Sequence, residues 1–165
     1  MLNIEVQKTS DKVASEWREY KDDKGNVLAK FLIAGSKRPA YQKGLELMQA
    51  QFEREMIGLV KVDDKSALYT DNLIATAGKY LLLDWEGIAT ADGEFKFSTE
   101  NAVTLLTKTK DGLLLWKWIE DQAKDIQAKA DDAVNNLVGK SLNSTTTARP
   151  SGTARSKKAS TRPSA

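Results

Sequence analysis

The stretch from Lys79 to Asn101 concentrates most of the stop and start signals of the sequence in twenty-three residues. Gly87 and Gly93 can supply the positive φ that helix ends and tight turns require, and Ser98 or Thr99 can cap a helix that follows. The pattern predicts a helix that ends in Leu-Asp-Trp-Glu-Gly, a tight Asp-Gly turn and a new helix. We expect an architectural joint of two helices, with Trp85 as its buried structural anchor.

The composition excludes most kinds of catalytic site. The 165 residues, 41% hydrophobic and 29% charged, suit one globular domain, and they include neither cysteine nor histidine. Catalytic triads, Cys–His pairs, disulfides and most zinc sites are therefore excluded. We expect a binding or assembly role, no enzymatic activity, no cofactor and no metal.

No apolar run approaches the roughly 18 residues that a membrane helix needs. The runs at residues 81–83 and 113–116 are the longest, and the N-terminus lacks the basic flank and apolar core of a secretory signal. We therefore expect no membrane association and a cytoplasmic location.

The N-terminal third predicts a β-hairpin. Residues 1–12 are expected to form a loose strand or a disordered lead. Trp17, Tyr20 and the apolar run at residues 27–33 flank a turn-rich segment at residues 21–26. An isolated hairpin is marginal in water, so its apolar face should rest on the helices that follow.

Two helices are predicted next. The first should begin near Pro39, with Ser36 as a possible cap, and end at Gly58. Its apolar stripe is interpreted as core and consists of Leu45, Met48, Phe52, Met56 and Leu59. The second helix can be capped by Ser66. Its helical spacing is kept by Leu68, Leu73, Ile74, Ala77 and Leu81.

After the Asp-Gly turn of the joint, Phe95 and Phe97 alternate with Lys96 as on a short extended segment with one buried face. A third helix should open at Ser98, and a fourth should cover about residues 113–138. The early turns of the fourth helix are apolar on nearly every side and should be buried. Its later turns offer a narrow seam of Ala123, Ile126, Ala130, Ala133, Val134 and Leu137. Such a seam suits packing with another helix from the same or a second chain, so a homo-oligomer is possible.

Trp116 and Trp118 lie two residues apart and so on different faces of this helix. Either one of them is exposed, where tryptophan is enriched in interaction hot spots, or the hairpin covers the second face. The sequence leaves these alternatives equal. The candidate protein-binding residues are Trp116, Trp118, Ala123, Ile126, Ala130 and Leu137.

The predicted fold class is α+β and mainly α: an N-terminal β-hairpin packed on a bundle of about four helices, forming a single domain over residues 1–139. Residues 140–165 hold six basic residues and no acid, whereas residues 1–139 carry 19 basic and 23 acidic residues. This basic, low-complexity tail is expected to be disordered. It could bind nucleic acid through phosphates without reading sequence, although a neutral tail is favoured.

Three short motifs are assigned to ordinary structural roles. Gly139-Lys140-Ser141 lacks the first glycine of a phosphate-binding loop and follows a helix. The acidic turns at residues 22–26 (Asp-Asp-Lys-Gly-Asn) and 92–94 (Asp-Gly-Glu) lack the spacing of a calcium loop. Asp84 and Glu86, on either side of a tryptophan, have no partner nucleophile and are interpreted as solvated charges.

In their joint order, several segments resemble the tail assembly chaperones of long-tailed (siphovirus-type) bacteriophages. They are Phe31-Leu32-Ile33-Ala34, Arg38 to Leu45, Leu83-Asp84-Trp85-Glu86-Gly87-Ile88, Asp92-Gly93-Glu94 and Phe97 to Ala102, and the resemblance covers roughly residues 27–127. It implies a chaperone in the host cell cytoplasm that binds the tape-measure protein and helps tail-tube subunits polymerise around it. Such a chaperone does not remain in the finished particle. The alternatives are a virion structural protein of the tail or head-tail connector, and a small nucleic-acid-binding protein acting through the basic tail.

Overall fold

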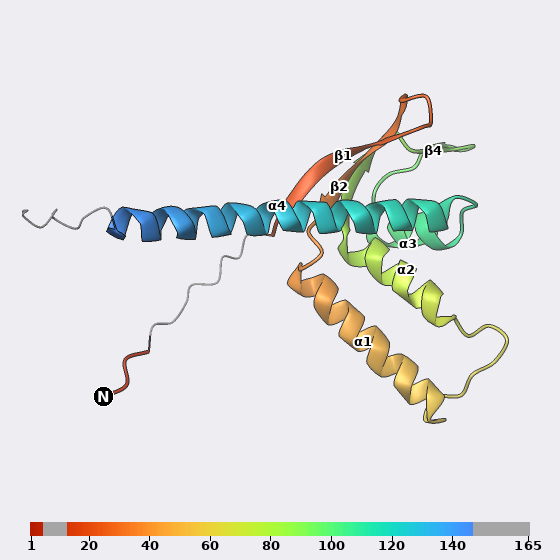
Figure 1. Cartoon of the computed structure of the whole chain (residues 1–165). Helices are drawn as coiled ribbons and strands as arrows, with labels where there is room; N and C mark the ends of the chain where they lie inside the picture. The colour runs from red at the N-terminus through yellow and green to blue at the C-terminus, as the bar shows by residue number, and fades with distance from the viewer. Residues whose placement is uncertain (5–12, 147–165) are drawn as a thin grey trace, which may run out of the picture. The chain divides into compact units, whose positions relative to one another are not determined.

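The computed structural model describes residues 1–4 and 13–146, and the side chains of the last helix through residue 139. The elements in chain order are β1 (Ser15–Lys21), β2 (Val27–Ala34), α1 (Pro39–Met56), α2 (Tyr69–Tyr80), β3 (Leu82–Glu86), β4 (Ala89–Thr90), β5 (Gly93–Glu94), α3 (Thr99–Thr107) and α4 (Gly112–Thr146) (Figure 1). The predicted α+β, mainly α class is confirmed. The contacts divide the chain into two units, Met1–Ala130 and Asp131–Ala165, and the first contains the sheet and α1 to α3.

The predicted N-terminal hairpin is confirmed. β1 pairs antiparallel with β2, so that Trp17 lies opposite Leu32. In the connecting turn Gly25 takes φ +84°, and the carboxylate of Asp22 accepts hydrogen bonds from the backbone N–H groups of Lys24 (2.9 Å) and Asn26 (2.8 Å). The turn therefore owes its geometry to one left-handed glycine and one side-chain acceptor.

The segment predicted to end the second helix is instead a third strand. β3 pairs antiparallel with β2, placing Trp85 opposite Phe31, and the sheet order is β1-β2-β3. α2 ends at Tyr80, ahead of the helix end predicted in residues 83–87, and the backbone N–H of Ala34 then bonds to the carbonyl of Leu81 (2.8 Å). A partner strand some fifty residues away wins over local helix periodicity here, since strand pairing satisfies the backbone and buries Leu82 and Trp85 together.

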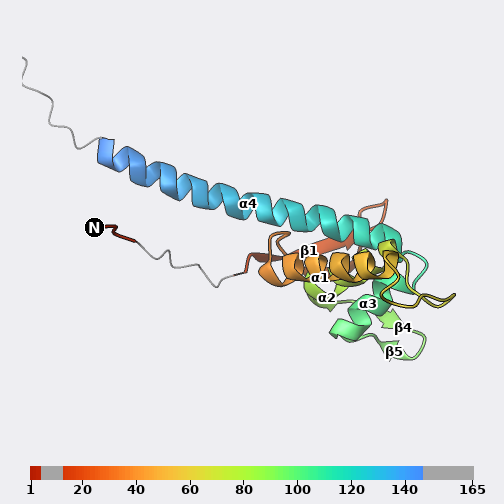
Figure 2. The same cartoon turned by 90° about the horizontal axis from the view of Figure 1, so that it is seen from below.

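The core of the first unit lies between one face of the sheet and the N-terminal part of α4. Phe31 and Ile33 of β2 are buried with four residues of α4: Leu115, Ile119, Ala123 and Ile126. Figure 2 shows this part of α4 running alongside β1. At the edge, the guanidinium of Arg18 on β1 donates to Gln122 (3.1 Å) and Asp125 (2.8 Å), which joins the sheet to α4 and lowers the pKa of Asp125.

Helix α1 is joined to α4 through Tyr41. Its hydroxyl donates to a carboxylate oxygen of Glu120 (3.3 Å), and the side chain is 7% exposed. Burial, followed by the Glu120 charge, raises the pKa of Tyr41 to about 12.

Small residues set the helix spacing. A Cβ at Gly44 would lie 2.4 Å from the Tyr80 ring, and a Cβ at Gly78 would lie 3.1 Å from the Ala102 carbonyl oxygen. α1 and α2 therefore approach closely at Gly44, and α2 and α3 approach closely at Gly78.

Two of the three predicted helix caps are wrong. Pro39 opens α1 as predicted, but the N-cap is Arg38 and no side chain caps the helix, so Ser36 is not the cap. Ser66 is not the cap of α2 either, because that helix begins three residues later, at Tyr69. The cap at Ser98 is confirmed: its Oγ accepts a hydrogen bond from the backbone N–H of Asn101 (3.0 Å).

The joint keeps its predicted turn chemistry. Gly87 (φ +83°) and Gly93 (φ +128°) take the expected positive φ values. The burial predicted for Trp85 is confirmed at 6% exposed, and its indole N–H donates to the carbonyl of Phe95 (2.6 Å). Phe95 stacks on the Trp85 ring and Phe97 meets it edge-on, so the alternation of these two phenylalanines is also confirmed.

The last helix differs from its prediction at both ends. α4 begins at Gly112, and Leu115 is buried in its first turn, whereas Leu113 is 47% exposed and Leu114 is 63% exposed. The helical backbone continues to Thr146, into the segment for which disorder was expected. The rest of the predicted tail, residues 147–165, and residues 5–12 of the predicted lead lie outside the described residues.

Candidate functional site

The structure places most of the predicted protein-binding residues in the core. Trp118 is covered by the hairpin, since its ring lies 5.0 Å from Tyr20 and 5.8 Å from Phe31. Trp116 is half-buried against the core, and its indole N–H is buried without an acceptor among the described residues. Ala123 and Ile126 are 0% and 4% exposed. Contacts within the chain therefore cover these four side chains.

The two remaining residues of that predicted seam differ from each other. Ala130 is half-buried, and Leu137, in the second unit, is 68% exposed. The tryptophan most exposed to solvent is Trp17 on β1, at 43%. The hairpin explanation for the second tryptophan face is thus confirmed, and surface for a partner has to be sought elsewhere.

Several exposed large apolar side chains of the first unit lie where α1 leads into α2. Between residues 56 and 68, five of them are more than half exposed: Met56 71%, Ile57 72%, Leu59 68%, Val62 57% and Leu68 71%. We call these five residues the apolar tip; Figure 1 shows the segment that carries them, at the turn between α1 and α2. Soluble domains rarely expose apolar side chains in such density unless something binds them.

The apolar stripe of α1 is only partly core, which corrects its prediction. Leu45, Met48 and Phe52 are half-buried, whereas Met56 and Leu59 are exposed. The fully buried positions of α1 are Tyr41 and Gly44, near its start. Toward its end the helix is covered chiefly by α2, through a ring contact of Phe52 with Tyr69 at 4.8 Å. The periodicity of the sequence identified the apolar face of α1 but not how much of that face other elements cover.

Backbone hydrogen bonds hold the start of the apolar tip in a defined conformation. Gly58 takes φ +76°, its N–H bonds to the carbonyl of Glu55 (3.1 Å), and the N–H of Leu59 bonds to the carbonyl of Arg54 (2.9 Å). This pair of bonds is the Schellman ending of a helix. Leu59, the residue that follows the glycine, is 68% exposed. The helix end is therefore well formed while its apolar side chains face solvent.

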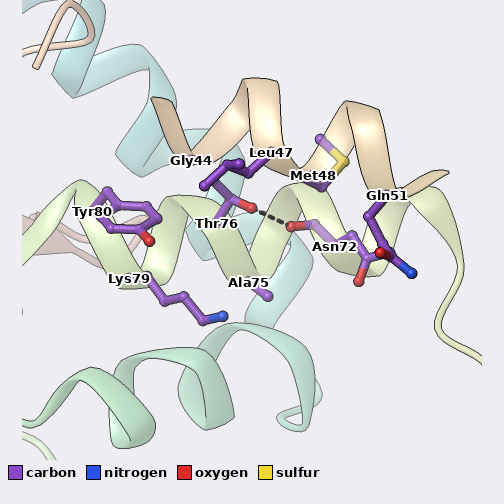
Figure 3. Close-up of a pocket in the computed structure, with 9 residues that line it drawn as sticks. All are labelled: Gly44, Leu47, Met48, Gln51, Asn72, Ala75, Thr76, Lys79 and Tyr80. Atoms are coloured by element: carbon purple, nitrogen blue, oxygen red, sulfur yellow. Dashed lines mark hydrogen bonds between the residues drawn. The ribbon is translucent and has the colours of Figure 1, made fainter. Parts of the chain in front are cut away.

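A groove of about 280 Å³ runs between α1 and α2 (Figure 3). It is lined by Gly44, Leu47, Met48 and Gln51 of α1 and by Asn72, Ala75, Thr76, Lys79 and Tyr80 of α2. The hydroxyl of Thr76 donates to the carbonyl of Asn72 (2.7 Å) and is thus satisfied within its own helix. The volume falls below the ~300–1,000 Å³ of small-molecule pockets, so the groove suits side chains of a protein partner better than a cofactor.

Within the described residues, no group of three or more acidic, histidine or cysteine side chains could hold a metal ion. No helix of that same part of the chain is long and apolar enough to cross a membrane. We call α1, α2 and the turn that joins them the α1–α2 hairpin. It offers apolar surface, two side-chain amides and a lysine, which is the chemistry of protein recognition.

Sequence reasoning missed this surface, although a signal was present. Ile57, Leu59 and Val62 continue an apolar pattern past the helix end at Gly58, into a segment that also contains Lys61 and Asp63. Apolar residues in a connection that cannot bury them are unusual and point to a contact outside the chain.

A comparison with protein-family models finds one family over the greater part of the chain. The model of the YdaY prophage protein family matches residues 33–140, from the end of β2 into α4, and so includes the whole α1–α2 hairpin. No curated protein and no solved structure matches the chain significantly. The chain therefore belongs to the family of YdaY prophage proteins and is phage-derived.

Proposed function

We propose that this protein is a phage tail assembly chaperone, which binds the tape-measure protein and helps tail-tube subunits polymerise around it. The observation that carries the proposal is the apolar tip, with five large apolar side chains more than half exposed in residues 56–68. Membership of a prophage family supports a phage-associated role.

The client of such a chaperone, the protein that it protects, is the long helical tape-measure protein. A long helical protein that is made before its tube exposes apolar stripes that favour aggregation, because burying apolar surface yields about 25 cal/mol per Å². A chaperone lowers that tendency by offering apolar surface of its own. The apolar tip offers such a surface. Because other residues form the core of the first unit, the exposure of the tip does not weaken the fold.

The test is co-expression with the tape-measure protein of the same prophage. The full chain should keep that protein soluble and co-purify with it. The double variant Ile57→Asp/Leu59→Asp should lose both effects, since the two side chains are 72% and 68% exposed and contribute little to folding. Leu114→Asp is the matched control, because Leu114 is 63% exposed but lies on α4, and it should behave like the wild type.

Two outcomes would refute the proposal. The first is a wild-type chain that neither binds the tape-measure protein nor keeps it soluble. The second is retention of the chain in purified phage particles at the copy number of a structural subunit, measured by quantitative mass spectrometry, which would indicate a virion component instead.

A further inference from the structure

We propose that the groove between α1 and α2 receives a helix of the client, with an acidic side chain of that helix placed beside Lys79. This inference rests on the proposed function and specifies how the same hairpin recognises its partner. It starts from the spacing of the lining residues, which is i, i+3, i+4, i+7 on each helix: 44, 47, 48 and 51 on α1, and 72, 75, 76 and 79 on α2.

That spacing is the signature of a seam between helices. Residues at i, i+3, i+4 and i+7 form one stripe on a helix, and two facing stripes leave the place that a third helix takes in a bundle. Each stripe covers eight residues, which span about 10.5 Å at a rise of ~1.5 Å per residue. The groove therefore accommodates about two turns of a helix, a length that fits a local segment of a long helical client.

The floor and walls of the groove favour close helix packing. Ala75 is small and half-buried, so the backbone of an incoming helix can come near it, while Leu47 and Met48 supply apolar contact. Gly44 lies against the Tyr80 ring, so it sets the distance between α1 and α2. Leu47 is 61% exposed and has little cover from its own chain. An occupant with leucine or methionine at matching positions would bury it.

The charge of Lys79 favours one orientation of the bound helix. Lys79 is the one charged side chain among the residues that line the groove, and it lies at one end of the α2 stripe. It takes no part in the ion pairs found in the described part of the chain. At the other end, Gln51 and Asn72 offer amides. A helix with a carboxylate on its apolar edge would therefore bind with that carboxylate at the Lys79 end, and charge of this kind selects orientation more than it adds affinity.

The experiment uses the absence of cysteine from the natural chain. A single cysteine at Gln51, in the groove, is labelled with an environment-sensitive dye, and Lys117→Cys on the exposed face of α4 is the control position. The probes are overlapping helical peptides of the tape-measure protein of the same prophage. Binding peptides should change the fluorescence at position 51 and leave it unchanged at position 117.

Two substitutions define the site. Ala75→Arg fills the floor and should weaken peptide binding at least tenfold, a hot-spot-sized effect. Lys79→Glu should weaken binding about fivefold, the range of an exposed ion pair. It should also restore the affinity of a peptide whose facing Asp or Glu is replaced by Lys. Circular dichroism of each variant shows whether the fold is kept.

The outcomes separate this inference from the proposed function. If Ala75→Arg binds the tape-measure protein like the wild type while Ile57→Asp/Leu59→Asp does not, the groove assignment is wrong and the chaperone role stands. If the wild-type chain binds no tape-measure protein, both fail. If a cross-linker at Gln51→Cys captures a second copy of this chain instead, the occupant is wrong and the groove is an oligomer contact.

Discussion

Replacement of Trp85 by alanine should remove a large part of the stability of the first unit. The side chain is 6% exposed and meets three rings, those of Phe31, Phe95 and Phe97, at centroid distances of 6.4, 5.6 and 5.0 Å. Removing a buried aromatic side chain costs about 3–5 kcal/mol, a figure that includes ring pairs of ~0.5–1.5 kcal/mol each. We expect a loss in the upper half of this range because three ring contacts disappear together.

Trp85→Phe divides this loss into packing and hydrogen bonding. The phenyl ring keeps most of the apolar contact but cannot donate to the Phe95 carbonyl, which the indole N–H meets at 2.6 Å. An acceptor left unsatisfied in the interior costs about 1–3 kcal/mol. Trp116→Phe is the matched control and should cost less, because the indole N–H of Trp116 has no acceptor among the described residues.

Urea unfolding followed by far-UV circular dichroism measures these differences without relying on tryptophan fluorescence. With an m-value of ~2 kcal/mol/M, a loss of ~4 kcal/mol lowers the midpoint by about 2 M. Domains of this kind have a free energy of unfolding of only ~5–15 kcal/mol, so Trp85→Ala can be unfolded even without urea. In that case Trp85→Phe provides the measurable change in unfolding free energy. A midpoint shift for Trp85→Ala no larger than that of Trp17→Ala, at a side chain 43% exposed, would refute the reasoning.

Three further predictions concern helix contacts, capping and pH. Gly44→Ala should destabilise the fold by about 1–3 kcal/mol, because the new Cβ would lie 2.4 Å from the Tyr80 ring. Gly139→Ala should stabilise α4 by up to ~1 kcal/mol, because a Cβ there meets no atom within 4 Å; the urea midpoints of the two variants are compared. Ser98→Ala should cost ~1 kcal/mol through the lost N-cap of α3, and an unchanged thermal midpoint would contradict the cap. Because the folded-state pKa of Tyr41 is raised to about 12 from the ordinary 10.0, the folded state holds this proton longer than the unfolded state, so stability should fall as pH rises from about 10 to 12. Tyr41→Phe should flatten that fall, as measured by urea unfolding across the same pH range.

The sequence predicted elements well where the signal is local. The hairpin around Gly25, the start of α1 at Pro39 and the cap of α3 at Ser98 each depend on a few neighbouring residues, and all three are confirmed. β3 was not predicted, because its pairing joins Trp85 to Phe31 across a long stretch of chain and the helical spacing before it runs on to Leu81. Local periodicity carries no information about such a partner strand.

The candidate site was harder to predict than the fold. Trp116, Trp118 and Ile126 have the residue types of an interface, yet all three pack in or against the chain's own core, with Trp118 against Phe31 of the sheet. The stripe of α1 looked like core, yet it ends in exposed Met56 and Leu59. An apolar pattern is the same for a buried face and for a recognition face. Only the positions of neighbouring elements decide between them.

The hydrogen bonds around Gly58 also bear on how quickly the chain can meet a partner. Because the carbonyls of Arg54 and Glu55 are already bonded, Ile57 and Leu59 are displayed from a backbone that does not have to fold on encounter. An ordering entropy of ~1–2 kcal/mol per residue is then absent from the association step. The heat capacity of binding should accordingly match the apolar area buried, without the larger change that accompanies coupled folding. Such a preformed end suits the role proposed above, in which a nascent helix has to be bound before it finds another copy of itself.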